Sequence, residues 1–234
     1  MAKYLIVGAS AAGIGAVEAI RDVDPVGSIT VISDEVCPLY SRPMISDFVS
    51  GKADFSKMKC RSDAFWTENN LQAVTGKKAI SLNLSENTIS LENGEKVTYE
   101  KLLLATGGKP FVPKIEGQNK DGVFTFTTIQ DAQCLATKIE KINAKSAVVI
   151  GAGLIGLSVT EALTKRGLKV TLVELQDKIL SLLLDSLASG LVEGVGATVS
   201  TETIKDPIVG FVFGVKGLIA DASVKGSKLT KMKK

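Results

Sequence analysis

The chain has 234 residues, 45% of them hydrophobic, and a formal net charge of +3 from 28 basic and 25 acidic residues. This length and composition are typical of a globular protein with two domains, and the near balance of charge gives no reason to expect nucleic-acid binding. Histidine is absent, which excludes histidine metal ligands and Ser-His-Asp or Cys-His hydrolysis, and Cys37, Cys60 and Cys134 form no Cys-x-x-Cys pair, which excludes a zinc ribbon or a redox-active dithiol of the usual spacing.

Hydropathy and charge allow predictions about membrane association and about the C-terminal tail. The N-terminus runs directly into an apolar stretch, and no apolar run approaches the ~20 residues of a membrane-spanning helix. We therefore expect no membrane span and a cytoplasmic protein. Residues 225–234 hold five lysines and no acid, and we interpret this tail as solvated and frayed.

A first nucleotide-binding pattern opens the chain. Residues 4–7 form a short apolar strand, followed by the small-residue segment GASAAG and a helical pattern through Ile20. Strand, tight turn and helix in this order are typical of a dinucleotide-binding unit, although Ser10 replaces the middle glycine. Residues 29–32 predict the next strand, and the two acids after it stand where ribose-binding acids belong. The residues expected at this first site are Gly8, Ser10, Ala12, Gly13, Asp34 and Glu35.

The segment from residue 36 to residue 110 completes the first predicted domain. Residues 36–52 follow neither a helical nor a strand period. Two prolines, one of them Pro43, hold Arg42 near the first site, where it either contacts the ligand or makes a surface salt bridge. A strand is predicted at 73–74. A β-meander follows at 79–84, 88–91 and 96–99, with turns at 85–87 and 93–94, and then a last buried strand at 101–106.

The second nucleotide-binding pattern is the stricter of the two. After a loop at 111–122 and an amphipathic helix at 127–142, a buried strand at 147–150 leads into GAGLIG. A helix is predicted at 157–165, ending near Gly167, and a strand at 169–173 ends at an acid placed to accept ribose hydroxyls. Only Lys178 is near that acid, so NAD is favoured over NADP. The alternative is a glycine turn without a ligand. The residues expected at this second site are Gly151, Gly153, Leu154, Ile155, Gly156 and Glu174.

These elements predict an α/β protein with two Rossmann-like domains, each with a parallel sheet and a β-meander. The domains are expected at residues 1–110 and 111–234, related by an internal repeat of about 143 residues. Beyond residue 174 the pattern weakens to a helix at 179–192 and strands at 197–201 and 208–219. No metal site and no catalytic side chain are predicted.

Four segments in order, GASAAG, DEVCPLYSRPMIS, TYEKLLLATGGKP and VVIGAGLIG with VTLVE, resemble the pyridine nucleotide-disulfide oxidoreductase superfamily. The resemblance covers residues 3–185 and is strongest to members without a dithiol, such as rubredoxin and ferredoxin reductases and the flavin domain of nitrite reductase. It implies FAD at the first site, NADH at the second, and hydride transfer from nicotinamide to flavin. It further implies that Arg42 and Pro43 lie near the pyrophosphate and flavin of FAD, and that Ala79 contacts the adenine. Ala105, Thr106 and Gly107 correspond to a second FAD-binding motif.

The sequence also departs from this superfamily. The lysine and glutamate that many members carry near the flavin are Asp47 and Ser158 here, so such a pair is not expected, and Cys37 lies about five residues before the position of the cysteine in single-thiol members. The sequence shows no counterpart of the superfamily's C-terminal Gly-Asp strand and interface domain, so we expect an NAD(H)-binding domain that is incomplete at its C-terminal end and a chain that is truncated relative to the superfamily. We expect an FAD-dependent NADH oxidoreductase that passes electrons to a small redox protein or a partner subunit. The alternative is a non-catalytic nucleotide-binding subunit that needs a partner chain, and self-association is left open.

Overall fold

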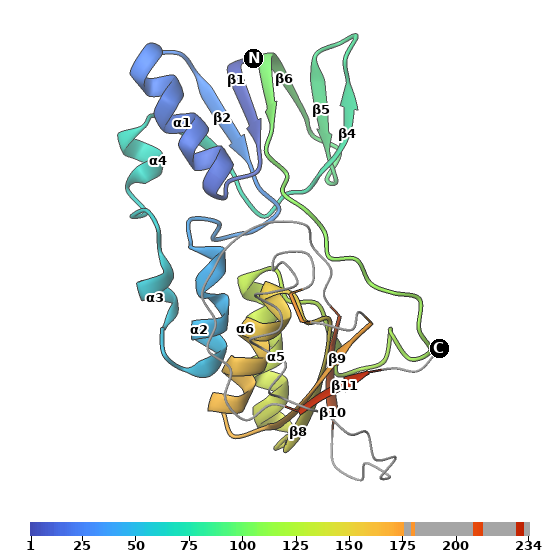
Figure 1. The fold of residues 1–234 in the computed structure, drawn as a ribbon. Helices are drawn as coiled ribbons and strands as arrows, with labels where there is room; N and C mark the ends of the chain where they lie inside the picture. The colour runs from blue at the N-terminus through green and yellow to red at the C-terminus, as the bar shows by residue number, and fades with distance from the viewer. Residues whose placement is uncertain (176–178, 181–207, 213–227, 232–234) are drawn as a thin grey trace. The chain divides into compact units, whose positions relative to one another are not determined.

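The computed structural model describes residues 1–175, 179–180, 208–212 and 228–231 (Figure 1). The chain forms two compact units. The first contains Met1–Ser41 and Phe55–Gly107, and the second contains Arg42–Asp54 and Gly108–Lys234. The division between the units falls at Gly107 and Gly108, and the segment 42–54 is part of the second unit.

The first unit is built on a six-stranded sheet with the order β3-β2-β1-β6-β5-β4. Strands β1, β2, β3 and β6 are parallel, whereas β4, β5 and β6 form an antiparallel meander. The bounds of its elements are β1 Ala2–Val7, α1 Ala11–Val23, β2 Ile29–Ile32, α3 Phe55–Met58, α4 Phe65–Glu68, β3 Leu71–Val74, β4 Ala79–Asn83, β5 Thr88–Leu91 and β6 Lys96–Leu104.

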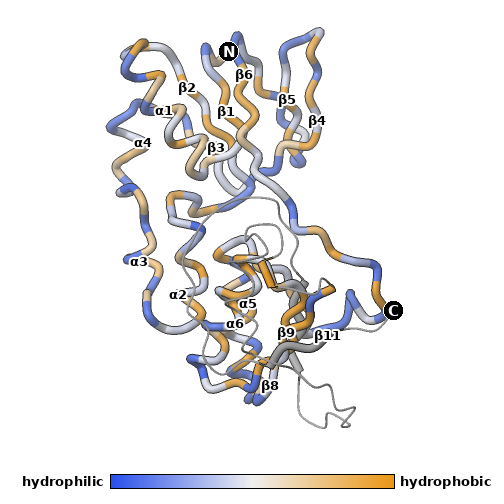
Figure 2. The backbone as a smooth tube through the Cα atoms, viewed as in Figure 1, coloured by the Kyte–Doolittle hydropathy of each residue, from blue (hydrophilic) through white to orange (hydrophobic). Residues whose placement is uncertain are grey.

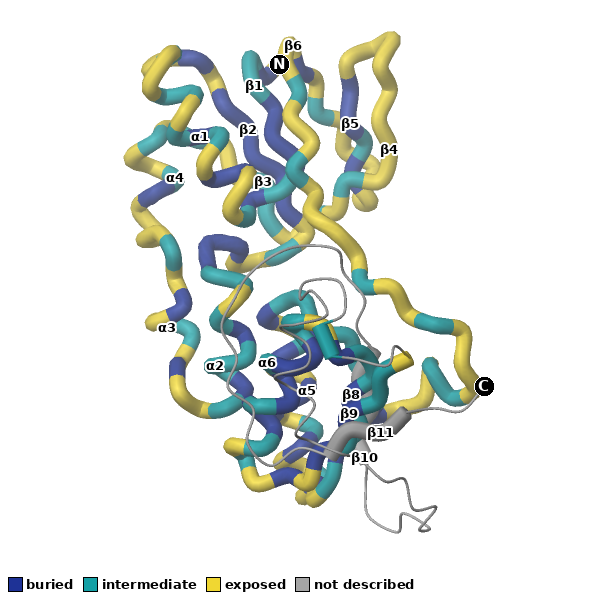
Figure 3. The backbone as a smooth tube through the Cα atoms, in the orientation of Figure 1, coloured by how far each residue is buried: buried dark blue, intermediate teal, exposed yellow. Residues whose placement is uncertain are grey.

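The core of the first unit lies on both faces of its parallel strands. Successive side chains of a strand point to opposite faces, so Ile6 of β1 packs with Ile14 of α1, whereas Leu5 and Val7 pack with Ile89 of the meander. Every residue of β2 is buried, and most of this strand is hydrophobic, as Figures 2 and 3 show. Continuous apolar runs of this kind are typical of parallel strands covered on both sides.

Strand β6 differs from the prediction, which placed two separate strands at 96–99 and 101–106 and expected the second of them to be buried. It is a single strand whose first part, Lys96–Thr98, pairs with β5, and whose later part pairs with β1 alone among the described strands. Leu103 and Leu104 are 40% and 56% exposed. The expectation of burial was wrong for these two leucines: side chains stand perpendicular to a sheet, so their exposure means that the described elements leave these faces of β6 uncovered.

The second unit contains a five-stranded parallel sheet with the order β11-β9-β8-β10-β7. The pairing of β11 with β9 corrects the expectation of a frayed tail for residues 228–231. The predicted helix at 179–192 and strand at 197–201 lie outside the described residues, except that 179–180 form a turn. The bounds of its elements are α2 Ile45–Ser50, β7 Val123–Phe124, α5 Ile129–Lys141, β8 Ser146–Ile150, α6 Leu154–Lys165, β9 Lys169–Glu174, β10 Ile208–Val212 and β11 Lys228–Lys231.

Helix α2 was not predicted. A 3-10 turn at Arg42–Met44 leads into it, and Gly51, with φ of +78°, ends it. The helix packs against α5 and α6 (Figure 1), and Ile45 and Val49 are buried in that contact region. Six residues are too few to display a helical period in the sequence. In the described part of the chain, no helix is long and apolar enough to cross a membrane.

Candidate nucleotide-binding sites

The first glycine turn connects β1 to α1. The Gly8 amide donates to the Ile32 carbonyl at 2.8 Å, and Gly8 has φ of +113°, a conformation that side chains rarely allow. A Cβ added to Gly13 would lie 1.9 Å from the Gly8 carbonyl oxygen. Glycine at residue 13 is therefore required for the close approach of helix and turn.

The second glycine turn, between β8 and α6, repeats this geometry. The Gly151 amide donates to the Val173 carbonyl at 2.7 Å, and a Cβ on Gly156 would lie 1.9 Å from the Gly151 carbonyl oxygen. A Cβ on Gly153, by contrast, would meet no atom of the described residues within 4 Å. The middle glycine therefore leaves open space in front of the helix, and a ligand needs such space to come close to the protein backbone.

The helices that start at these turns differ from α5 in how they begin. Neither α1 nor α6 has a side-chain hydrogen bond at its N-cap or an acidic residue in its first turn. Helix α5 is capped by Thr128 and Asp131, which bond reciprocally to each other's backbone amides. The first amides of a helix lack intrahelical acceptors and carry the positive end of its dipole. The beginnings of α1 and α6 therefore suit an anionic ligand such as a pyrophosphate.

The predicted acidic residues follow β2 and β9. Glu174 accepts from the Ala152 amide at 2.6 Å and from the Leu175 amide at 2.8 Å, so its carboxylate lies against the second glycine turn. After β2, Asp34 is exposed, whereas Glu35 accepts from the Tyr40 hydroxyl at 2.6 Å. The two acids of the first unit therefore differ in their surroundings, and Glu174 lies against the turn that follows β8.

Of the remaining predicted residues of the first unit, Ala105 lies against its glycine turn. The Ala105 amide donates to the Val7 carbonyl at 2.8 Å, and a Cβ on Gly8 would lie 2.0 Å from the Ala105 carbonyl oxygen. The segment before Ala79 lies beside the acids, because the Gly76 amide donates to the Glu35 carbonyl at 3.2 Å. Thr106 and Gly107 continue from Ala105 and are exposed.

Arg42 and Pro43 belong to the second unit, where Nη1 of Arg42 donates to the Thr127 carbonyl at 2.7 Å. Near them the Ser158 hydroxyl donates to the Ser46 hydroxyl at 2.7 Å. The side chains of Ser158 of α6 and Ser46 of α2 are therefore in contact, and Ser46 immediately precedes Asp47 in the sequence.

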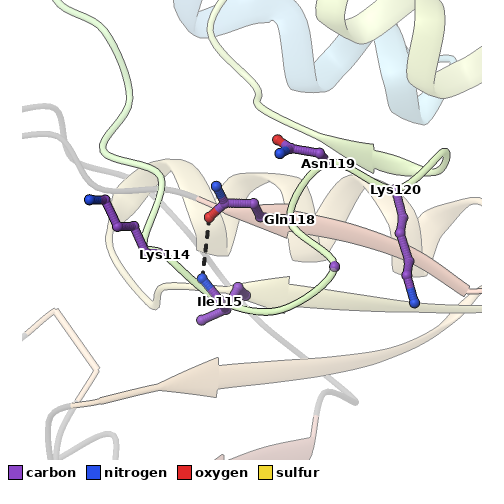
Figure 4. Close-up of a pocket in the computed structure, with 6 residues that line it drawn as sticks. Lys114, Ile115, Gln118, Asn119 and Lys120 are labelled. Carbon is purple, nitrogen blue, oxygen red and sulfur yellow. Dashed lines mark hydrogen bonds between the residues drawn. The ribbon is translucent and has the colours of Figure 1, made fainter.

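Two features were missed by sequence reasoning. Tyr40 gave no signal as a partner of Glu35, since the contact depends on how residues 36–40 turn back. A hollow also lies on the loop between β6 and β7, where the Ile115 amide donates to Oε1 of Gln118 at 3.2 Å (Figure 4). None of the predicted site residues lines it. Its lining consists of Lys114, Ile115, Gly117, Gln118, Asn119 and Lys120.

Comparison with known proteins agrees with this geometry. Residues 2–198 match the family model described as pyridine nucleotide-disulphide oxidoreductase. Subunit epsilon of the NADH-dependent phenylglyoxylate dehydrogenase of Aromatoleum evansii is 35% identical, over 97% of this chain and 52% of that protein. The rubredoxin-NAD(+) reductase of Pseudomonas putida is 31% identical, over 82% of this chain and 51% of that protein. The chain thus spans about half the length of these relatives.

A solved structure shows the same fold. The NAD-dependent persulfide reductase from A. fulgidus superposes with a TM-score of 0.74 and 31% identity, over 81% of this chain and 37% of that chain. The match of the family model over most of the sequence and the repeated glycine turns point to one conclusion. The chain belongs to the pyridine nucleotide-disulphide oxidoreductase family, whose members are flavin-containing, NAD(P)H-dependent oxidoreductases that bind FAD and NADH.

Proposed function

We propose that this chain is an FAD-dependent NADH oxidoreductase that takes hydride from NADH and passes electrons to a redox protein or a partner subunit. The observation that carries the proposal is the pair of glycine turns, each opening into a helix without a side-chain cap or an acid in its first turn. The side chains of Thr128 and Asp131 cap α5, whereas α1 and α6 begin without such a cap, so we assign their first amides to the binding of an anionic group.

In the first unit, we propose that FAD is held by backbone groups. The amides of residues 10–13, at the start of α1, would face its pyrophosphate, with the glycines at 8 and 13 allowing the tight turn. Ala105, Thr106 and Gly107 lie beside that turn and would form a second contact with FAD. Ala79 at the adenine, and Arg42 and Pro43 toward the flavin, rest on the family resemblance alone.

In the second unit, we propose that NADH binds across the turn between β8 and α6. The amides of Leu154, Ile155 and Gly156 would face its pyrophosphate, and the open space at Gly153 would admit it. Glu174 would accept ribose hydroxyls. Its carboxylate is held near the turn by two amides, so the additional phosphate of NADPH would meet a negative charge there. This arrangement favours NADH over NADPH.

The bound flavin supplies the hydride and electron chemistry, and the protein supplies position and surroundings. For the acceptor, the relatives give two kinds of candidate. One is a reductase named for rubredoxin, and the other is a subunit of an NADH-dependent dehydrogenase. We propose a partner protein of one of these kinds as the electron acceptor.

The experiment that tests this function is a visible spectrum of the purified chain, with and without added FAD, followed by NADH under argon. Oxidised flavin bands that stay with the protein on gel filtration and bleach with NADH support the proposal, and slower bleaching with NADPH supports the role of Glu174. A chain that takes up no FAD refutes the proposal for this chain alone. That result favours the alternative of a nucleotide-binding subunit completed by a partner.

A further inference from the structure

The loop between β6 and β7, residues 105–122, exposes a group of large apolar side chains. Phe111 is 71% exposed, and Val112 and Ile115 are 37% and 41% exposed. Among the residues that the structure describes, Phe111 is the only exposed aromatic residue. Exposed apolar side chains that are grouped and bordered by polar ones are typical of an interaction surface.

The same loop is basic. Residues 108–120 contain Lys109, Lys114 and Lys120 and a single acid, Glu116, so three positive charges and one negative charge give this segment +2, whereas the whole chain carries +3. All three lysines are exposed. None of them forms an ion pair with a residue that the structure describes. Their charge is therefore available to a negatively charged partner.

Hydrogen bonds within the loop hold it in one shape. The Ile115 amide donates to Oε1 of Gln118, and the Gln118 amide donates to the Ile115 carbonyl, both at 3.2 Å. The Lys120 amide donates to the Gly117 carbonyl at 2.9 Å. Two prolines in the segment further restrict its backbone. A loop that is ordered before binding loses less conformational entropy on association.

The directions of the lysines indicate what kind of partner fits. Figure 4 shows Lys114 and Lys120 on opposite sides of the hollow, with their ammonium groups pointing away from each other, so they do not converge on one small anion. A second copy of this chain would bring like charges together. Three lysines attract an anionic membrane only weakly, and Glu116 among them opposes that attraction. A protein with separate carboxylates around an apolar patch matches this surface.

We propose that residues 109–120 form a docking surface for an acidic redox protein, whose carboxylates pair with the lysines of the loop while an apolar patch covers Phe111. This inference rests on the proposed function, in which the chain passes electrons to a partner protein, and it adds the chemistry by which that partner is recognised. Electron-transfer complexes use small interfaces, in which one aromatic anchor within a charged rim carries much of the affinity.

The test measures the affinity of the full chain for two probes, a rubredoxin and a ferredoxin that both have a net negative charge, by calorimetric titration. Each titration is made at about 20 mM and at about 1 M salt, because the Debye length falls to about 3 Å at the higher concentration. The original chain should bind at least one probe, and should bind it at least about tenfold more weakly at high salt.

Three variants separate charge, position and apolar contact. Lys114→Glu with Lys120→Glu should weaken binding about 10- to 100-fold at low salt and less than about threefold at high salt. The matched control, Lys96→Glu with Lys169→Glu, changes the net charge equally at two exposed lysines outside the loop and should weaken binding no more than about threefold. Phe111→Ser should weaken it about 10- to 30-fold at both salt concentrations, because apolar burial is not screened. Thermal unfolding confirms that each variant is folded.

Several outcomes overturn the proposal. Equal weakening in the two double variants would show that net charge attracts the probe and not this loop, and unchanged affinity in Phe111→Ser would remove the apolar contact. The proposal also fails if neither probe binds, including the case in which the lysines bind vesicles of anionic lipid instead. Bleaching of bound flavin by NADH, measured in parallel, separates this inference from the proposed function. If the flavin bleaches but binding does not depend on the loop, only this inference fails. If no FAD is taken up but the loop variants weaken binding as expected, only the proposed function fails.

Discussion

Alanine substitutions at two glycines of the second turn should separate binding from stability. In Gly156→Ala the new methyl group would lie 1.9 Å from the Gly151 carbonyl oxygen, which is about 1.5 Å closer than an ordinary contact, so backbone must move. We expect a loss of at least about 3 kcal/mol of unfolding free energy, which corresponds to a fall in Tm of roughly 6 to 12 °C for a chain of this size.

In Gly153→Ala the methyl group points into open space, and φ of −77° suits alanine. The less favourable N-cap residue costs about 0.5 to 1 kcal/mol, and the reduced freedom of the unfolded chain offsets about 0.4 to 1 kcal/mol, so Tm should change by no more than about 3 °C. The methyl group occupies the approach of the pyrophosphate. The loss of one charge-assisted hydrogen bond, about 1.5 to 3 kcal/mol, should weaken NADH binding at least about tenfold.

The assay combines thermal unfolding without ligand and calorimetric titration with NADH, and FAD uptake serves as the control because both substitutions lie in the second unit. If Gly153→Ala lowers Tm as much as Gly156→Ala does, the space in front of α6 is not open. If Gly153→Ala binds NADH as tightly as the original chain, the pyrophosphate does not pass that residue. Either result would refute the reasoning about the middle glycine.

Three further predictions concern the stability of single contacts. Asp24 accepts from the Lys3 ammonium at 2.6 Å, and this bond, with others, holds the pKa of the Asp24 carboxyl well below its usual range. Its stabilising contribution is therefore present above about pH 4, the unfolded value, and is lost as pH falls further. Tm measured from pH 6 to pH 2 should drop less steeply in Asp24→Asn, and an unchanged slope would contradict this. The Tyr99 hydroxyl is buried and has no hydrogen-bond partner among the residues that the structure describes, so Tyr99→Phe should raise Tm by about 2 to 4 °C, and a clear decrease would reveal a partner. Thr128→Ala removes the bond from the Asp131 amide and should cost about 1 kcal/mol in denaturant unfolding, whereas Thr128→Ser should cost little.

Much of the fold could be predicted because the information is local. The apolar run at 29–32 coincides with β2, and the repeated glycine spacing located both βα turns before any tertiary contact was known. Strand β6 was divided in error because Glu100 and Lys101 interrupt its apolar character. Their side chains are exposed, so they do not oppose a continuous strand. Helix α2 was missed because its six residues are stabilised by α5 and α6, which no local pattern reveals.

The candidate sites show the same division. Gly8, Gly13, Gly151 and Gly156 serve turns whose geometry depends on immediate neighbours, and the spacing alone located them. The position of Arg42 depends on which unit its segment joins, a choice made by packing between distant helices. The hydrogen bond from Tyr40 to Glu35 likewise depends on a reversal of the chain that no sequence motif indicates.

The membership of residues 42–54 in the second unit has a consequence for the order of synthesis. Val49 of α2 accepts a hydrogen bond from Arg166, 117 residues later in the chain. At about 5 to 20 residues per second, the ribosome needs roughly 6 to 25 s to deliver that partner. In the later half of this interval the complete sequence of the first unit has already been synthesised, while Ile45 and Val49 still lack the α6 partner. We expect the nascent chain to expose this short apolar helix until α6 emerges, which makes residues 42–54 a natural early binding segment for a chaperone.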